Sequence, residues 1–197
     1  MTFAEFESIV ESQPDGVILL EGRRDIPASD YQQATSLAHK LATMFPRLRF
    51  RSGNAEGSDQ AFSDGVAAVD AGRLQIIAPY ETHRKKFRYP EATYGSPASL
   101  STTVEDEIAY KTTHATPKNE RLIKHWGGKG RMAVYAAYLI RDTMKVTGFA
   151  PDFIKPICGI FYVDPEDPMK GGTGHTVRVC ELEGVPVAFQ DAWQNWL

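Results

Sequence analysis

The chain has few cysteines, no surplus of either charge and no long apolar run, and each absence excludes a class of protein. Two cysteines, Cys158 and Cys180, are too few for the disulfide framework of a small secreted protein. The longest apolar run, from Met132 to Ile140, is far shorter than the ~20 residues of a membrane-spanning helix. The first residues lack the basic and then apolar pattern of a secretory signal. We therefore expect a cytoplasmic protein that does not enter membranes.

The charge balance excludes a dedicated binder of duplex DNA. The 197 residues include 22 Lys and Arg against 25 Asp and Glu, a net charge of −3, whereas such binders usually carry a basic surplus. Contact with nucleic acid would have to come from a local basic patch. The five histidines show no metal-ligand spacing, so we predict no metal, and we predict no cofactor. The length and the ordinary composition predict one domain over residues 1–197.

Apolar runs alternate with helical patterns along most of the chain. The run from Val17 to Leu20 is apolar on both faces, as in a central strand of a parallel sheet. Further strands are predicted over residues 48–53, 74–79, 157–163 and 186–190. The first three alternate with helical stretches at the spacing of βαβ units. The predicted fold class is α/β, with a Rossmann-like parallel sheet of about five strands between helices.

The part between the third and fourth predicted strands is less regular. Residues 80–99 are predicted to form a long loop, and helices are predicted over residues 101–113, 119–125 and 131–146. We interpret this part as a helical insertion between strands three and four. Residues 80–89 interleave basic and aromatic side chains, a pattern that can bind single-stranded nucleic acid or stack on a base. A solvated charged loop is the alternative interpretation.

Three glycine-containing turns follow predicted strands. Glycines let backbone N–H groups approach an anion, and a helix N-terminus favours negative charge. If the first and fourth strands are neighbours, the first and third turns meet where the strand order reverses, and ligands bind there in such sheets. Tight loop geometry, helix capping by Asp59 and solvated arginines are the plainer alternatives. The turns are Gly22-Arg23-Arg24-Asp25, Ser52-Gly53-Asn54-Ala55-Glu56-Gly57-Ser58-Asp59 and Lys170-Gly171-Gly172-Thr173-Gly174-His175-Thr176, the last before a helix predicted over 175–183.

These turns resemble motifs of the SLOG superfamily, which includes the fold of DNA-processing protein A and the LOG-type phosphoribohydrolases. The first turn is similar to its G-[SR]-R-D loop, the second to its S-G-[GN]-A-x-G-x-D-x-x-A loop, and Gly171 to Thr176 to its G-G-T-x-H-T-type loop. The resemblance covers about residues 16–79 and 156–190 and implies binding of nucleotides or of derivatives such as ADP-ribose. It implies hydrolysis in some branches, but this chain has Arg178 where the LOG-type hydrolases have a catalytic glutamate.

The predicted function is therefore binding of a nucleotide or an ADP-ribose-like derivative. His175 is expected to bond a phosphate, with an acid or base role as the alternative. We assign no catalytic residue and no metal ligand, and the oligomeric state is left open, a homodimer included. The predicted ligand-binding residues are Gly22, Arg23, Arg24, Asp25, Gly53, Gly57, Ser58, Asp59, Gly171, Gly172, Thr173, Gly174, His175 and Thr176.

Two other functions remain open at this point. One is hydrolysis of the N-glycosidic bond of nucleoside monophosphates, in which Asp25 or Asp59 would have to replace the missing glutamate. The other is weak binding of single-stranded nucleic acid by residues 80–89. We predict more strongly that the protein binds its ligand than that it transforms it.

Overall fold

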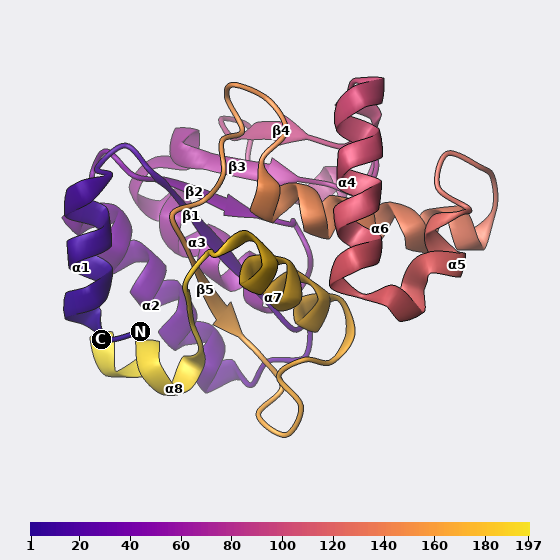
Figure 1. The fold of residues 1–197 in the computed structure, drawn as a ribbon. Coiled ribbons are helices and arrows are strands. Elements are labelled where there is room, and N and C mark those ends of the chain that lie inside the picture. Colours follow the sequence, from indigo (N-terminus) through magenta and orange to yellow (C-terminus); the bar gives the residue numbers. More distant parts are fainter.

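The centre of the protein is a parallel sheet of six strands in the order β4-β3-β2-β1-β5-β6. A computed structural model describes all residues from 1 to 197 (Figure 1). Ile18 of β1 pairs with Phe50 of β2 on one side and with Cys158 of β5 on the other. The chain builds outward from β1 and then resumes beside it at β5, so the first and fourth predicted strands are neighbours. The strands are β1 (Val17–Gly22), β2 (Arg49–Ser52), β3 (Leu74–Ile77), β4 (Thr93–Gly95), β5 (Cys158–Tyr162) and β6 (Val187–Ala188).

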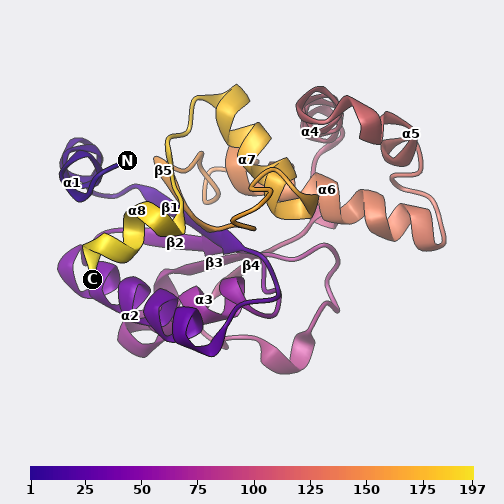
Figure 2. The ribbon, with the colours of Figure 1, turned by 90° about the horizontal axis from the view of Figure 1, so that it is seen from below.

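Helices cover both faces of this sheet (Figure 2). Helices α2, α3 and α8 pack on one face together with α1, whereas α6 and α7 pack on the other, with α4 beyond α6. The α-helices are α1 (Phe3–Ser12), α2 (Ala28–Met44), α3 (Ser58–Asp70), α4 (Thr102–Ala115), α5 (Glu120–Ile123), α6 (Arg131–Thr147), α7 (Gly171–Glu183) and α8 (Gln190–Trp193). The 3-10 turns are Ala71–Arg73, Lys85–Phe87, Pro97–Ser99, Pro117–Asn119 and Gln194–Trp196. The structure is thus a Rossmann-like α/β fold.

Alternation along β1 decides which side chains meet which helices. Ile18 and Leu20 belong to the apolar cluster under α2 and α3, whereas Leu19 belongs to the cluster under α6 and α7. Successive side chains of a strand point to opposite faces, so Glu21 follows Leu19 toward α6 and α7. A carboxylate is thereby placed inside the sheet–helix interface, at the end of the central strand.

The sheet has one strand more than predicted. Thr93–Gly95 forms β4, which pairs in parallel with β3 at the edge of the sheet, inside the segment predicted to be a loop. This strand is only three residues long and includes a glycine, so it carries no apolar alternation by which it could be found. The insertion between β3 and β5 therefore contains β4 as well as the predicted helices.

Helix α7 begins at Gly171, four residues before the predicted start at His175. Glycine is a poor helix former, so this glycine-rich turn carries no helical signal in the sequence. In the structure the N–H of Gly174 donates to the carbonyl of Lys170 at 3.0 Å and closes the first helical turn. A Cβ at Gly174 would overlap the backbone of Met169, so the close passage of that chain explains the glycine there.

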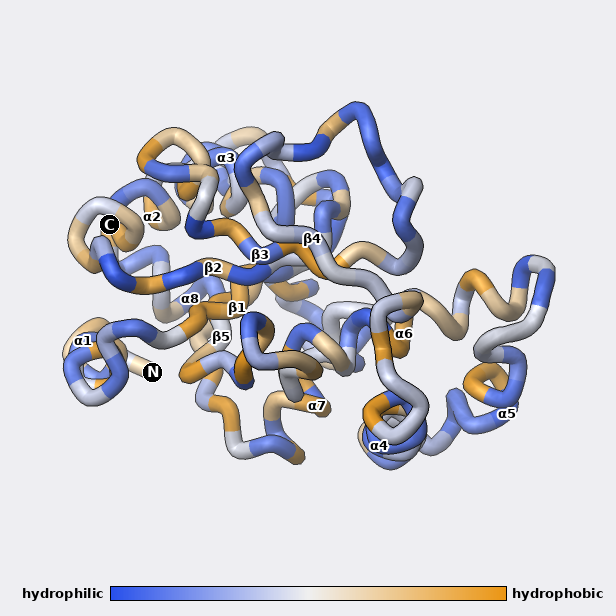
Figure 3. Tube along the Cα trace, turned by 90° about the horizontal axis from the view of Figure 1, so that it is seen from above, coloured by the Kyte–Doolittle hydropathy of each residue, from blue (hydrophilic) through white to orange (hydrophobic).

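The insertion helices extend beyond the end of the sheet. Figure 3 shows α4, α5 and the start of α6 standing out from it, with α5 farthest away. At the opposite end the two termini meet, where the ring of Phe3 lies 5.8 Å from that of Trp196. No helix combines the length and the apolar character needed to cross a membrane.

Candidate functional site

A cavity of about 760 Å³ lies over the carboxyl end of β1. Its walls come from the loop after β1, the start of α3, the turn between α4 and α5, the middle of α6 and the segment that leads into α7. This is the point between β1 and β5 at which the strand order reverses, where ligands bind in open α/β sheets.

The cavity brings together the first and third glycine turns but little of the second. The predicted site residues that line it are Gly22, Arg23, Arg24, Asp25, Asp59, Gly171, Gly172 and Thr173. Those that do not line it are Gly53, Gly57, Ser58, Gly174, His175 and Thr176.

The second turn forms hydrogen bonds with the backbone of the first turn. Ser58 Oγ donates to the carbonyl of Arg23 at 2.7 Å, and Asp59 Oδ1 accepts from the N–H of Gly22 at 3.2 Å. Gly57 has a φ of 77°, and a Cβ there would overlap the backbone of Arg24. The second turn therefore holds the Gly22–Asp25 loop in place, and direct contact of Gly53, Gly57 or Ser58 with a ligand stays a prediction.

The third turn lies at one end of the cavity and presents unpaired backbone N–H groups there. Gly171, Gly172 and Thr173 form the first turn of α7, and the first N–H groups of a helix have no acceptor within it. The helix dipole adds positive potential at this end. A Cβ at Gly171 would meet nothing within 4 Å, so the backbone here is open to a ligand.

Some cations of the cavity are paired with carboxylates and one is not. Arg23 lies 3.3 Å from Asp25 and 3.6 Å from Asp164, and Lys170 lies 3.6 Å from the same Asp164. Arg24 has no carboxylate within ion-pair distance and lies 5.9 Å from the ring centre of Tyr138. Arg24 is therefore a guanidinium that is available to an anion.

His175 and Thr176 point into the protein rather than into the cavity. The Nδ1 of His175 lies 2.8 Å from Thr116 Oγ1, and its Nε2 lies 3.1 Å from Thr143 Oγ1. Burial lowers the pKa of His175, so the ring is neutral. Thr176 Oγ1 donates to Glu21 Oε1 at 3.0 Å. The ring of His175 therefore joins α7 to α6 and to the turn after α4, and its contact with a phosphate stays a prediction.

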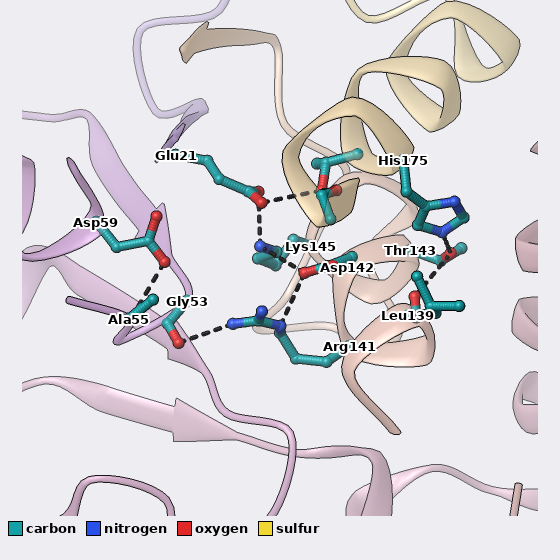
Figure 4. A network of polar contacts seen from close by, with 12 residues as sticks. Glu21, Gly53, Ala55, Asp59, Leu139, Arg141, Asp142, Thr143, Lys145 and His175 are labelled. Carbon is teal, nitrogen blue, oxygen red and sulfur yellow. Dashed lines mark hydrogen bonds and ion pairs between the residues drawn. The ribbon is translucent and has the colours of Figure 1, made fainter. Parts of the chain in front are cut away.

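A buried ionic network forms the floor of the cavity, and sequence reasoning missed it (Figure 4). Lys145 Nζ lies 2.6 Å from Glu21 Oε2 and 2.9 Å from Asp142 Oδ1. Arg141 Nε lies 2.9 Å from the same oxygen of Asp142, and Arg141 Nη1 donates to the carbonyl of Gly53 at 2.8 Å. Glu21, Arg141 and Asp142 line the cavity, and Lys145 lies beneath them.

Burial sets the protonation of this network. Burial raises the pKa of Glu21 to about 7, although the charge of Lys145 opposes the rise. The sequence contains one signal for the network, because Arg141, Asp142 and Lys145 interrupt an otherwise apolar helical stretch. Buried charged residues need partners of opposite charge, here both within α6 and in Glu21 of β1.

The wall of the cavity farthest along α6 is aromatic and apolar. It is formed by Leu122 of α5 and by Tyr135, Tyr138 and Leu139 of α6. The side chain of Tyr135 is 41% exposed, so part of its ring is open to solvent. Sequence reasoning treated these tyrosines only as part of an apolar helix.

The basic segment 80–89 lies beside the cavity without lining it. His83 packs edge-on against Tyr138, with ring centres 5.8 Å apart. Arg84 Nη1 donates to the carbonyl of Asn54 at 3.2 Å, so this arginine is used within the fold. Lys85, Lys86 and Phe87 are exposed, with Phe87 56% exposed. Only part of the predicted basic and aromatic pattern is therefore free for a ligand.

Comparison with known proteins adds a likeness in fold. No protein-family model matches the chain, and no curated protein matches it. A solved structure of DNA processing protein A from Helicobacter pylori, described for its single-stranded DNA binding mode, is similar with a TM-score of 0.54. The likeness covers 92% of this chain and 67% of that chain at 13% sequence identity. At this identity it shows the Rossmann-like fold alone.

Proposed function

We propose that the cavity binds a nucleotide or a nucleotide derivative, with a phosphate group at the first turn of α7. The observation that carries the proposal is that one cavity has hydrogen-bond donors at one end and aromatic rings at the other. Free N–H groups of Gly171, Gly172 and Thr173 lie at one end, and Tyr135 and Tyr138 lie at the other. The volume of about 760 Å³ is within the range of small-molecule sites.

In the proposed complex the backbone donors and the cations of the cavity have distinct roles. The backbone donors and the helix dipole hold the phosphate, as helix N-termini do in other phosphate sites. Arg23 is kept in position by Asp25 and Asp164, and Arg24 adds an unpaired guanidinium beside Tyr138. The similarity of the three turns to SLOG motifs supports the same class of ligand.

The base of the ligand would lie against the tyrosine wall. Aromatic rings stack on nucleobases with little dependence on the identity of the base. Leu122 and Leu139 add apolar surface beside the rings. This end therefore favours a planar ligand over a sugar phosphate that lacks a base.

Thermal unfolding with and without ligand tests this proposal. Because a ligand that binds only the folded state stabilises it, AMP or ADP-ribose should raise the unfolding temperature, and inorganic phosphate should do so less. Arg24→Gln should reduce the shift, whereas Arg47→Gln should not, since Arg47 pairs with Asp15 outside the cavity. A panel of phosphorylated nucleosides at millimolar concentration that gives no shift would reject the proposal.

Single-stranded nucleic acid is the second candidate ligand, and one structural observation favours it. Lys85, Lys86 and Phe87 project from a segment adjacent to the cavity, and the protein of similar fold binds single-stranded DNA. Affinity for a short oligothymidine should be weak and should fall steeply as salt rises, because phosphate contacts release counterions.

A charge reversal separates this candidate from the first. Lys85→Glu combined with Lys86→Glu should abolish oligothymidine binding and leave the AMP-induced shift intact. The control is Lys124→Glu combined with Lys129→Glu, two exposed lysines elsewhere on the surface. Equal losses in both double variants would show a diffuse charge effect and reject this segment as the site.

A further inference from the structure

One carboxylate oxygen on the cavity floor has no protein partner. Asp142 is 2% exposed and lines the cavity. Its Oδ1 faces both Arg141 and Lys145, each at 2.9 Å. Its Oδ2 lies 3.2 Å from the position that a Cβ on Gly172 would occupy and takes no part in these ion pairs, both of which reach Oδ1. This oxygen therefore faces the cavity beside the first turn of α7.

The other carboxylates of the floor are already occupied. Both oxygens of Asp59 accept backbone N–H groups, from Gly22 at 3.2 Å and from Ala55 at 3.3 Å. Glu21 faces Lys145 with one oxygen and accepts from Thr176 with the other. Asp142 is thus the floor carboxylate that can accept a hydrogen bond from a ligand.

The charge of Asp142 restricts what can lie against it. Burial alone would raise the pKa of Asp142, but Arg141 and Lys145 more than offset this and hold it below its ordinary value. An ionised carboxylate only accepts hydrogen bonds, so the facing ligand group must be a donor. A phosphate oxygen is excluded from this position by like charge, while the N–H groups of α7 attract it nearby.

The position of Asp142 along α6 identifies the donor. Gly172, at the proposed phosphate end, is next to it, and Tyr138 is one turn earlier in α6, about 6 Å along the helix axis. The group between the phosphate and the base of a nucleotide is the ribose. We propose that Asp142 Oδ2 accepts a hydrogen bond from a ribose hydroxyl, so that the cavity selects ribonucleotides over their deoxy analogues. This inference rests on the proposed function.

Ligand analogues test the inference on the unaltered protein. The affinities of AMP, 2′-deoxy-AMP, 3′-deoxy-AMP and 2′,3′-dideoxy-AMP are compared by calorimetry, with GMP, CMP, UMP and ADP-ribose as further ribose ligands. A hydrogen bond to a charged group corresponds to about tenfold to hundredfold in affinity, so dideoxy-AMP should bind at least about tenfold more weakly than AMP. The two singly deoxygenated analogues show which hydroxyl is bound.

A variant pair assigns the effect to Asp142. Asp142→Asn should lower the affinity for AMP by about tenfold and leave the affinity for dideoxy-AMP nearly unchanged. The variant should therefore no longer discriminate between the two ligands. The control Asp15→Asn removes an exposed carboxylate that pairs with Arg47 outside the cavity, so it should keep both the affinity for AMP and the discrimination. Circular dichroism checks that both variants fold. If Asp142→Asn does not fold, the analogue series on the unaltered protein decides whether a ribose hydroxyl is bound.

The outcomes separate this inference from the proposed function. Equal affinities for AMP and dideoxy-AMP would overturn the role of Asp142 and leave nucleotide binding in place. A discrimination that survives in Asp142→Asn would also overturn it. Absence of binding by every ribonucleotide of the panel would overturn both the proposed function and this inference.

Discussion

The second and third glycine turns look alike in the sequence and differ in what lies against them. A Cβ at Gly57 in the second turn would overlap the backbone of Arg24, and a Cβ at Gly53 would overlap the guanidinium of Arg141. A Cβ at Gly171 in the third turn would meet nothing within 4 Å, and one at Gly172 would meet only Asp142. Glycine therefore serves dense packing in the second turn and access to the backbone in the third.

Alanine substitutions give the largest expected difference between the two turns. Gly57→Ala requires a residue with a side chain at a φ of 77° against a backbone carbonyl, so it should lower the free energy of unfolding by about 3 kcal/mol or more. Gly171→Ala has the same restriction on φ, but its new side chain meets no neighbouring atom. It should lower the free energy of unfolding by about 1 kcal/mol. Urea unfolding measures both values. Similar losses in the two variants would contradict the distinction between packing and access.

The pH dependence of stability probes the ionic network on which the second turn packs. Folding raises the pKa of Glu21 from 4.5 to about 7, so its contribution to stability is complete below the unfolded pKa and is lost as pH rises through the folded pKa. Burial lowers the pKa of His83 to about 4 and also lowers that of His175. These two histidines give the opposite slope in part of the same window, so the contribution of Glu21 must be isolated by a variant.

Glu21→Gln isolates that contribution. Relative to the unaltered protein, the variant should gain on the order of 2 kcal/mol as pH rises from about 5 to 8. Urea unfolding across this range gives the difference at each pH. A difference that stays constant with pH would show that Glu21 has the same pKa in the folded and unfolded states.

The sequence predicts features of the structure that depend on neighbouring residues better than features that depend on contacts between distant residues. The positions of the strands and of the glycine turns follow from apolar runs and turn residues, which are local signals, and the meeting of the first and third turns follows once β1 and β5 are neighbours. The edge strand β4 is too short to carry a pattern, and the first turn of α7 consists of residues that include glycines, which are poor helix formers. Local patterns in the sequence therefore predict the strands and turns that surround the cavity.

The floor of the cavity could not be predicted in the same way. Glu21 and Lys145 are far apart in the sequence and meet because β1 and α6 pack together. His175 has the sequence context of a ligand-binding residue, and only packing shows that Thr116 and Thr143 occupy its ring nitrogens. Long-range packing decides which polar residues face a ligand and which ones hold the fold together.

The smallest expected effect concerns chemistry at the open turn. Cleavage of an N-glycosidic bond develops positive charge on the ribose, which a carboxylate stabilises, but Arg178 lines the cavity here. Asp59 is held by backbone N–H groups, and Asp25 is at the exposed rim. AMP incubated overnight with the protein should therefore yield no free adenine by chromatography. Adenine release that is lost in Asp25→Asn or Asp59→Asn would identify a hydrolase and its carboxylate.

The central claim is that the third turn, and not the second, receives the anionic end of a nucleotide. Titration of isotope-labelled protein with AMP, followed by the backbone amide resonances in nuclear magnetic resonance spectra, tests this most directly. The account predicts the largest shifts at Gly171, Gly172 and Thr173, with smaller ones at Gly53 and Gly57. Shifts concentrated at Gly53 and Gly57, with Gly171 to Thr173 unmoved, would contradict it.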